Sequence, residues 1–250
     1  MEIATPPGYS KLVALDSKRH RGLGVVSQRH QFAARLTGIY LAAAEFIQAA
    51  RHYPVVFAQD ATSNEFVPVA VTGLEQNINL FVDADGRWQP AVYIPAFVRC
   101  WPFYGVRITD GAKRGELLIC VDEKGLDAAG EPLFEDKDNP GSLLKSAQAL
   151  IQELEAARGA TTQLCQSLKT LDLLTPFEAH ALPKQGREWR VRGMYRVDET
   201  RLNALDAEVV KRLMNSGELP RIYAHLMSLD NFKFLMDLAV ARQAATAVMH

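Results

Sequence analysis

The chain has 250 residues, of which 48% are apolar and 23% charged, a composition typical of a globular protein with a sizeable core. Its 28 basic and 29 acidic residues give a net charge of −1, which excludes a generic binder of nucleic acid or other polyanions. Because the N-terminus lacks the pattern of a secretion signal and no run of roughly 18 apolar residues is present, we expect a cytoplasmic protein without membrane insertion.

The three cysteines support this expectation. Cys100, Cys120 and Cys165 are odd in number, widely spaced and set among apolar residues. Such cysteines are typical of reduced, buried thiols in a reducing compartment. We therefore predict no disulfide, and we interpret Cys120, within the run LLIC, as a core residue and not a nucleophile.

The N-terminal part of the chain is predicted to contain a helix followed by a strand. Residues 9–15 enter a strand or lie along the body, and the basic run from Lys18 to Arg21 forms a solvated loop, with an anion site as the alternative. Apolar and alanine side chains at helical spacing predict a helix within residues 32–50. Pro54 ends this helix just before a strand that begins with Val55 and Val56.

Further strands follow up to residue 121. Residues 65–74 read as a strand in which Pro68 indicates an edge position or a bulge. Residues 80–82 and 91–98 flank the turn sequence DADG and predict a hairpin. Residues 116–121 are a short apolar run typical of a buried strand. Because few helices separate these strands, they favour antiparallel pairing.

The second half is predicted to be mainly helical. Residues 142–157 form an amphipathic helix with Ser142 as its N-cap, and a second segment at 161–174 ends before Pro176. Residues 188–197 alternate as a strand with one wet face.

Helices complete the chain. Residues 201–215 form a helix with an acidic start and a glycine stop, and residues 220–237 begin with a helix that opens on a proline. Residues 243–250 are expected to fray. We therefore predict an α+β fold, a mainly antiparallel sheet of about five to seven strands with helices packed on it. Residues 1–240 form a single domain and residues 241–250 a C-terminal tail.

Several of these segments resemble, in order, the SapC family: EFIQAARHYPVVF, VPVAVTGLEQNINLFVD, AVYIPAFVRCWPF, ELLICVDE, GEPLF, YRVDETRLNAL and LPRIYAHLMSLDNF. The resemblance runs from about Tyr9 to Phe232 and is to the soluble SapC-like proteins. A membrane permease shares the name, but it requires several spans that this sequence lacks. The resemblance implies a link to peptide uptake or resistance, or to outer-membrane receptor systems, and it supplies no catalytic residues. Cys100 stands where the family pattern has a second arginine after Arg99.

Arg99 lies in an aromatic segment that suggests a binding site. Its guanidinium, beside Tyr93, Phe97 or Trp101, would hold a carboxylate while the rings receive an apolar group. The structural alternative is that Arg99 stacks on these rings and pairs with Asp83 or Asp122. Candidate ligand-binding residues are Arg99, Tyr93, Phe97, Trp101, Asp83 and Asp122.

Carboxylates offer a second candidate site. Asp83, Asp85, Asp122 and Glu123 follow predicted strands and would bind a metal or act as acid and base if they met at one sheet end. Turn formation and capping are the alternative for Asp85 and Asp122. The six histidines lack metal-ligand spacing, and His225 is interpreted as a structural, partly buried histidine. We predict no metal, no cofactor and no catalytic residue.

The C-terminal apolar stripe suggests an interface. Tyr223, Met227 and Phe232 belong to a run with more large apolar groups than one helix face requires, so we consider a partner protein or a homodimer, with core packing as the alternative. The leading hypothesis is a non-enzymatic accessory protein that binds a peptide-like or amino-acid-like ligand or a partner protein. The alternatives are an enzyme or enzyme subunit that modifies a peptide or aromatic substrate, and a structural homodimer.

Overall fold

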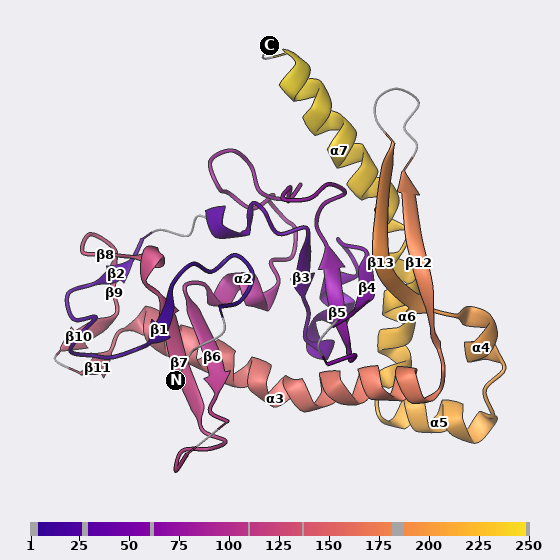
Figure 1. Cartoon of the computed structure of the whole chain (residues 1–250), viewed down its shortest axis with the longest axis horizontal. Coiled ribbons are helices and arrows are strands. Elements are labelled where there is room, and N and C mark those ends of the chain that lie inside the picture. The colour runs from indigo at the N-terminus through magenta and orange to yellow at the C-terminus, as the bar shows by residue number, and fades with distance from the viewer. Residues whose placement is uncertain are drawn as a thin grey trace.

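The computed structural model describes residues 5–26, 30–60, 63–109, 111–136, 138–181 and 188–248. The fold is α+β, with antiparallel sheets and helices packed against them (Figure 1). The largest sheet has five strands in the order β12 (Leu174–Ala181), β13 (Trp189–Val197), β4 (Val55–Gln59), β5 (Phe66–Val71) and β3 (Gly38–Tyr40).

The remaining strands form smaller sheets. One has the order β1 (Leu12–Ala14), β7 (Leu117–Asp122) and β6 (Phe103–Arg107). Short strands make the others: β2 (Gly24–Val25), β8 (Leu126–Asp127) and β9 (Glu131–Pro132), and β10 (Phe134–Asp136) with β11 (Asn139–Pro140). The predicted antiparallel pairing is confirmed, and the largest sheet has five strands, within the predicted range; the smaller sheets were not predicted.

The helices differ greatly in length. Those that follow the sheets are α3 (Ser142–Thr170), α4 (Glu199–Asn203), α5 (Ala207–Asn215), α6 (Glu218–Ser228) and α7 (Asn231–Val248). The short ones are η1 (Gln31–Ala33), η2 (Ala43–Glu45), α1 (Phe46–Ala49), α2 (Ala96–Cys100) and η3 (Glu123–Gly125). Within the described residues, none of the helices is both long enough and apolar enough to cross a membrane.

Helix α3 connects the two larger sheets. Its first half buries Leu144 and Ile151 in a cluster with β6 and β7, and its second half buries Leu164 and Leu168 in the main core. Figure 1 shows α3 crossing β6 and β7 at one end and running below β3, β5 and β4 at the other. Because burying each leucine or isoleucine contributes about 1.5–3 kcal/mol, this helix holds the two sheets in a fixed relation.

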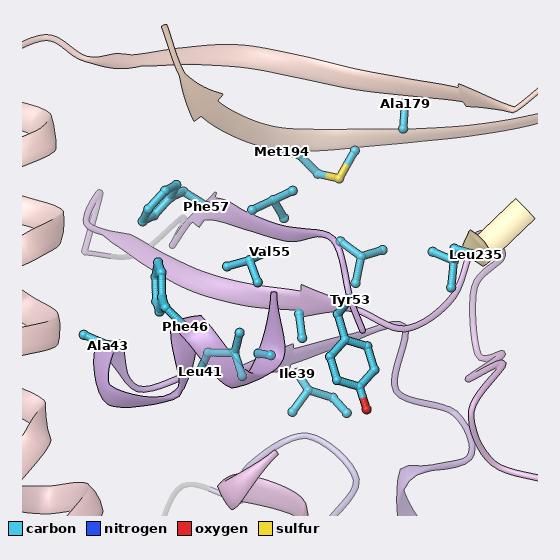
Figure 2. Packing of buried hydrophobic residues seen from close by; sticks show 14 of the residues in the cluster. Ile39, Leu41, Ala43, Phe46, Tyr53, Val55, Phe57, Ala179, Met194 and Leu235 are labelled. Atoms are coloured by element: carbon cyan, nitrogen blue, oxygen red, sulfur yellow. The ribbon is translucent and has the colours of Figure 1, made fainter. Parts of the chain in front are cut away.

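The main core is built around β4. Figure 2 shows Val55 and Phe57 of β4 among Ile39 of β3, Met194 of β13 and Leu235 of α7, all of them buried. Tyr53 and Phe46, which precede β4, lie in the same cluster (Figure 2). Segments far apart in the sequence therefore share one core.

The helix predicted within residues 32–50 is wrong for most of that segment, where helical residues are confined to η1, η2 and α1. The segment contains η1, strand β3, η2 and the four-residue helix α1. Four of its seven alanines are small core residues: Ala33, Ala42, Ala43 and Ala49 are at most 2% exposed. The alanine spacing therefore reflects close packing around the end of the sheet, and tertiary contacts override the helix propensity.

The predicted hairpin over residues 80–98 is also wrong. Asp83 and Gly86 do form a tight turn, and Val82 pairs with Trp88 in an isolated bridge. The chain then continues without a second strand and forms helix α2, which begins after Pro95. A proline before a short apolar run is compatible with a helix start as well as with a strand, and here the helix forms.

Two prolines occupy strand positions that differ from those predicted. Pro68 lies in β5, which is an inner strand and not an edge strand. Its carbonyl accepts from the Leu41 N–H, so its nitrogen faces the same side, and the one bond that the proline cannot make is the reciprocal bond to Leu41, just past the end of β3. Pro176, predicted to end a helix, lies inside β12, an edge strand that the sequence analysis missed.

The helix boundaries also needed correction. The two predicted segments at 142–157 and 161–174 are one helix, α3, whose N-cap is Gly141 and not Ser142. The helix predicted at 201–215 is two helices, and Asp198 caps the first by accepting from the Thr200 and Arg201 N–H groups. Helix α7 continues through Val248, past the point where fraying was expected, and residues 249–250 lie outside the described part.

The strands predicted at β1, β4, β7 and β13 are confirmed. The basic run is less solvated than predicted. His20 is fully buried, with its Nδ1 3.0 Å from the Asp16 nitrogen, and Arg19 pairs with Glu123.

His225 fastens α6 to the sheet. Its Nδ1 lies 2.6 Å from the Val55 carbonyl oxygen, and its Nε2 accepts from the Val197 N–H at 3.0 Å. The ring therefore bridges β4 and β13 in its neutral form, with Nδ1 as the donor. Burial lowers the pKa of His225 to about 4, and the Arg196 charge adds to this effect. The predicted structural role is confirmed, and the side chain is fully buried.

We expect stability to fall in mild acid because of His225. Its folded pKa of about 4 lies below the ordinary 6.5, so the unfolded chain takes up the proton first and stability is lost as pH falls from 6.5 towards 4. Between pH 7 and pH 5 this loss is on the order of 2 kcal/mol. Urea unfolding of wild type and His225→Gln at both pH values measures it, and the variant should show a smaller pH dependence.

The exposed His180 supplies the control. The His180→Gln variant should keep the wild-type pH dependence, because its side chain is 44% exposed. An equal pH dependence in wild type and His225→Gln would contradict the assignment of a neutral, buried His225.

Candidate functional site

Arg99 and Tyr93 lie together, as one of the sequence hypotheses required. The Arg99 Nε donates to the Ile94 carbonyl at 3.1 Å, and its guanidinium lies 5.7 Å from the centre of the Tyr93 ring. Arg99 Nη2 also lies 3.3 Å from the Tyr93 hydroxyl. Arg99 thus stacks on the Tyr93 ring and hydrogen-bonds within its own segment. The stacking that the sequence analysis considered as the structural alternative is therefore present.

Tyr93 in turn leads to a buried carboxylate that the sequence analysis did not single out. The Tyr93 hydroxyl donates to Glu45 Oε1 at 2.9 Å, and the Ala96 N–H donates to the same oxygen at 2.7 Å. Glu45 Oε2 accepts from the Ala42 N–H at 2.9 Å. Glu45 is only 6% exposed, so these bonds replace its water and anchor the start of α2 beside η2.

A second pair of aromatic residues reinforces the same place. The Tyr53 hydroxyl donates to the Tyr93 carbonyl and accepts from the Trp88 indole at 3.1 Å. Burial, with a smaller contribution from Glu45, raises the pKa of Tyr93 to about 12. The tyrosines are therefore neutral hydrogen-bonding groups, and the aromatic segment is largely a structural joint.

Phe97 and Trp101 lie apart from Arg99, on the other side of α2. The Trp101 ring stacks on Phe32 at 5.0 Å, and Phe97 meets the rings of Tyr9 and Tyr104 edge to face. The predicted aromatic wall around the arginine is therefore split between two environments.

Asp83 and Asp122 serve the backbone. Asp83 Oδ1 accepts from the Asp85 and Arg87 N–H groups of its own turn. Asp122 is 2% exposed and accepts from the N–H groups of Ser10, Lys11 and Lys124, which lower its pKa against the opposing effect of burial. The capping role considered for Asp122 is confirmed. Within the described residues, Asp83 and Asp122 share no hydrogen-bond partner.

A cleft lies between strand β6 of the smaller sheet and strand β5 of the five-stranded sheet. We call it the inter-sheet cleft, and its volume is about 930 Å³. Its lining residues come from strand β6 and the residues after it, from residues 65–68 around the start of β5, and from residues 151–166 of α3. Its apolar lining includes Phe66, Pro68, Phe97, Val106, Ile151 and Leu154. Of the predicted ligand-binding residues, only Phe97 lines it.

The lining of the cleft includes a cluster of charged side chains. Glu155 of α3 accepts from Arg107 Nε at 2.8 Å and lies 3.6 Å from Arg158 Nη1. Two guanidinium groups thus share one carboxylate. Tyr40 also lines the cleft, so polar side chains accompany an apolar surface, as in many small-molecule sites.

The cysteines are unreactive. All three are free and buried, as predicted. Burial raises the pKa of Cys100 and Cys165, both in the cleft lining, to about 12, and that of Cys120 to about 11. Thiols with such pKa values carry almost no thiolate at neutral pH. The described residues contain no group of three or more His, Cys, Asp or Glu side chains arranged to hold a metal ion, and His250 lies outside them.

Comparison with known proteins gives one match. A family model for SapC matches residues 15–235. The chain belongs to the SapC family. No curated protein and no solved structure matches it.

The segments that resemble the SapC family meet inside the fold. The EFIQAARHYPVVF segment supplies Glu45 and Tyr53, and AVYIPAFVRCWPF supplies Tyr93 and Ala96, which bind them. The LPRIYAHLMSLDNF segment supplies His225, which binds Val55 of the first segment. These SapC motifs therefore specify joints between elements.

The predicted interface residues have different environments. Tyr223 and Met227 of α6 are 48% and 76% exposed. Phe232 is half-buried and packs against Phe177 of β12, with ring centres 5.7 Å apart. Only the first two residues present an apolar surface, and Phe232 follows the core-packing alternative.

Substituting Glu45 should destabilise the fold strongly. In Glu45→Gln the side-chain amide would face N–H donors, so at least one buried hydrogen bond is lost and the free energy of unfolding should fall by about 2–4 kcal/mol. Urea unfolding at pH 7 measures this loss. The exposed Glu153→Gln on α3 is the matched control and should lie within about 0.5 kcal/mol of wild type. Equal stability of the two variants would contradict the anchoring role of Glu45.

Proposed function

We propose that the protein is a non-enzymatic accessory protein that binds a peptide-like or amino-acid-like ligand in the inter-sheet cleft. The proposal rests on the cleft itself, which has a volume of about 930 Å³. Its lining is largely apolar and includes the charged cluster of Arg107, Glu155 and Arg158. This volume is at the upper end of the range that small-molecule sites occupy. It suits a ligand of several residues better than a single small amino acid.

The chemistry of the lining supports a ligand with an apolar body and an anionic group. Phe97, Val106 and Leu154 offer apolar contacts. Arg107 and Arg158 share Glu155, so the group keeps a net positive charge that a carboxylate would neutralise. A peptide with apolar side chains and a free C-terminus has both features.

Several contacts favour binding over catalysis. Asp83 and Asp122, considered as an acid and base pair, are both engaged by backbone N–H groups. The thiols that line the cleft have raised pKa values. A cytoplasmic location belongs to the same proposal, and the free cysteines support it.

Filling the cleft should abolish binding without unfolding the protein. Thr162 lies on the exposed face of α3 and lines the cleft, whereas the neighbouring Gln163 is exposed and does not. We expect Thr162→Trp to lose affinity at least tenfold for apolar tetrapeptides or apolar amino acids, and Gln163→Trp to bind as wild type.

Native mass spectrometry and calorimetry with both kinds of ligand would test this. Circular dichroism would confirm that both variants are folded. If wild type binds none of these ligands, or if the two tryptophan variants bind equally, the proposed site is wrong.

Self-association or partner binding is a second candidate function. Tyr223 and Met227 lie one turn apart on α6 and are both exposed, and Ile47 of the adjoining helix α1 is 53% exposed. Large apolar side chains gathered on adjacent helices are typical of interfaces.

A charge on this surface should prevent self-association. We expect Met227→Glu to be monomeric at concentrations where wild type forms a dimer, because a carboxylate would be buried at the interface. Light scattering coupled to size-exclusion chromatography measures the mass. Val26→Glu is the control, since Val26 is exposed near β2 at the opposite end of the molecule (Figure 1). A monomeric wild type would exclude the dimer.

A further inference from the structure

The edge of β6 that faces the cleft has unused hydrogen-bonding groups. Among the described residues, β6 is an edge strand that pairs with β7 and with no other strand. At the ends of this ladder, Asp122 N–H donates to the Pro102 carbonyl and Ile108 N–H donates to the Glu116 carbonyl. Because the groups of successive residues in a strand point to alternate sides, residues 102, 104, 106 and 108 face β7. The N–H and C=O groups of Phe103, Gly105 and Arg107 face away from it.

One of these groups has a partner within the chain. The Phe103 carbonyl accepts from the Tyr9 hydroxyl at 3.0 Å. For Gly105 and Arg107, the described residues provide no partner to the outward backbone groups, and both residues line the inter-sheet cleft. Gly105 also lets α3 approach, because a β-carbon there would lie 2.6 Å from Ile151 Cγ2. The open edge therefore lies beside α3 in the lining of the cleft.

The opposite side of the cleft has a shorter open edge. The Pro68 carbonyl faces β3, where Leu41 N–H donates to it, so by alternation the backbone groups of Phe66 face the same side. β3 ends at Tyr40, and the Ala43 N–H donates to Thr161 Oγ1 of α3 instead of continuing along β5. Phe66 therefore presents its N–H and C=O groups to the cleft, which it lines.

We propose, on the basis of the proposed function, that the ligand is a short extended peptide that adds as a strand to the free edge of β6. Its backbone pairs with Gly105 and Arg107, and alternate side chains contact the apolar lining. Its C-terminal carboxylate lies beside Arg107 and Arg158, at the C-terminal end of β6, so the peptide runs parallel to β6. A free amino acid, which has no internal peptide group, would not use this edge.

Hydrogen exchange gives a direct test in the full chain. The probe is a tetrapeptide of alternating leucine and valine with a free carboxylate. We expect its binding to slow amide exchange at Gly105 and Arg107 at least tenfold. The amides of Tyr104 and Val106, which already pair with β7, should change little and serve as internal controls. If the tetrapeptide binds and the Gly105 and Arg107 amides exchange as before, strand addition is wrong.

Chemical variants of the peptide separate this inference from the proposed function. N-methylation of the amide that faces β6 should weaken binding about tenfold, with the effect alternating along the peptide. Equal binding of all N-methylated forms, or binding of free amino acids alone, would overturn strand addition but leave ligand binding intact. Absence of binding by every peptide and amino acid would overturn both.

The direction of the peptide has its own test. Arg158→Ala should weaken binding of the free-carboxylate tetrapeptide several-fold and should not affect its C-terminal amide. Arg99→Ala, an exposed arginine outside the cleft lining, should bind both forms as wild type does. If amidation of the C-terminus leaves affinity unchanged, the carboxylate does not lie at Arg107 and Arg158.

Discussion

The Glu45 carboxylate is the contact on which the arrangement of the cleft depends. Removing a charge from water is costly unless hydrogen bonds replace the water, and Glu45 receives them from Ala42, Tyr93 and Ala96. These donors come from two segments about fifty residues apart in the chain. The carboxylate thus holds the N-terminus of α2 against η2, and α2 carries Phe97 and Cys100 into the lining of the cleft.

A second set of polar contacts holds the other end of the molecule. Ser228 Oγ accepts from the Val55 N–H, His225 binds the Val55 carbonyl, and Asn231 Nδ2 donates to the Ala50 and Tyr53 carbonyls. The C-terminal helices are therefore fastened to the residues that lead into β4. Because the Glu45 joint and this C-terminal joint lie on either side of α1, the short segment between η2 and β4 fixes both halves of the fold relative to each other.

The success of sequence reasoning depended on how local each signal was. The alternation in β13 and the apolar run in β7 identify their strands, and the apolar periodicity of α3 identifies its helix. The helix predicted within residues 32–50 was largely wrong because alanine favours helices but is also the small side chain that close packing requires. The cleft could not be predicted, since β5, β6 and α3 are distant in sequence. The alternating run FYGVRI of β6, between Pro102 and a glycine turn, was a local signal that was missed.

The open edges and the buried carboxylate are connected. After Leu41 the N–H groups of Ala42 and Ala43 turn to Glu45 and Thr161, so β3 stops after three residues and leaves Phe66 of β5 uncovered. Proteins usually protect an exposed strand edge, because unpaired N–H and C=O groups invite another chain. Here the edge residues Phe66, Gly105 and Arg107 line a cleft together with α3 and the arginines around Glu155. The interactions that stop β3 therefore also create the opening in which an extended peptide is expected to bind.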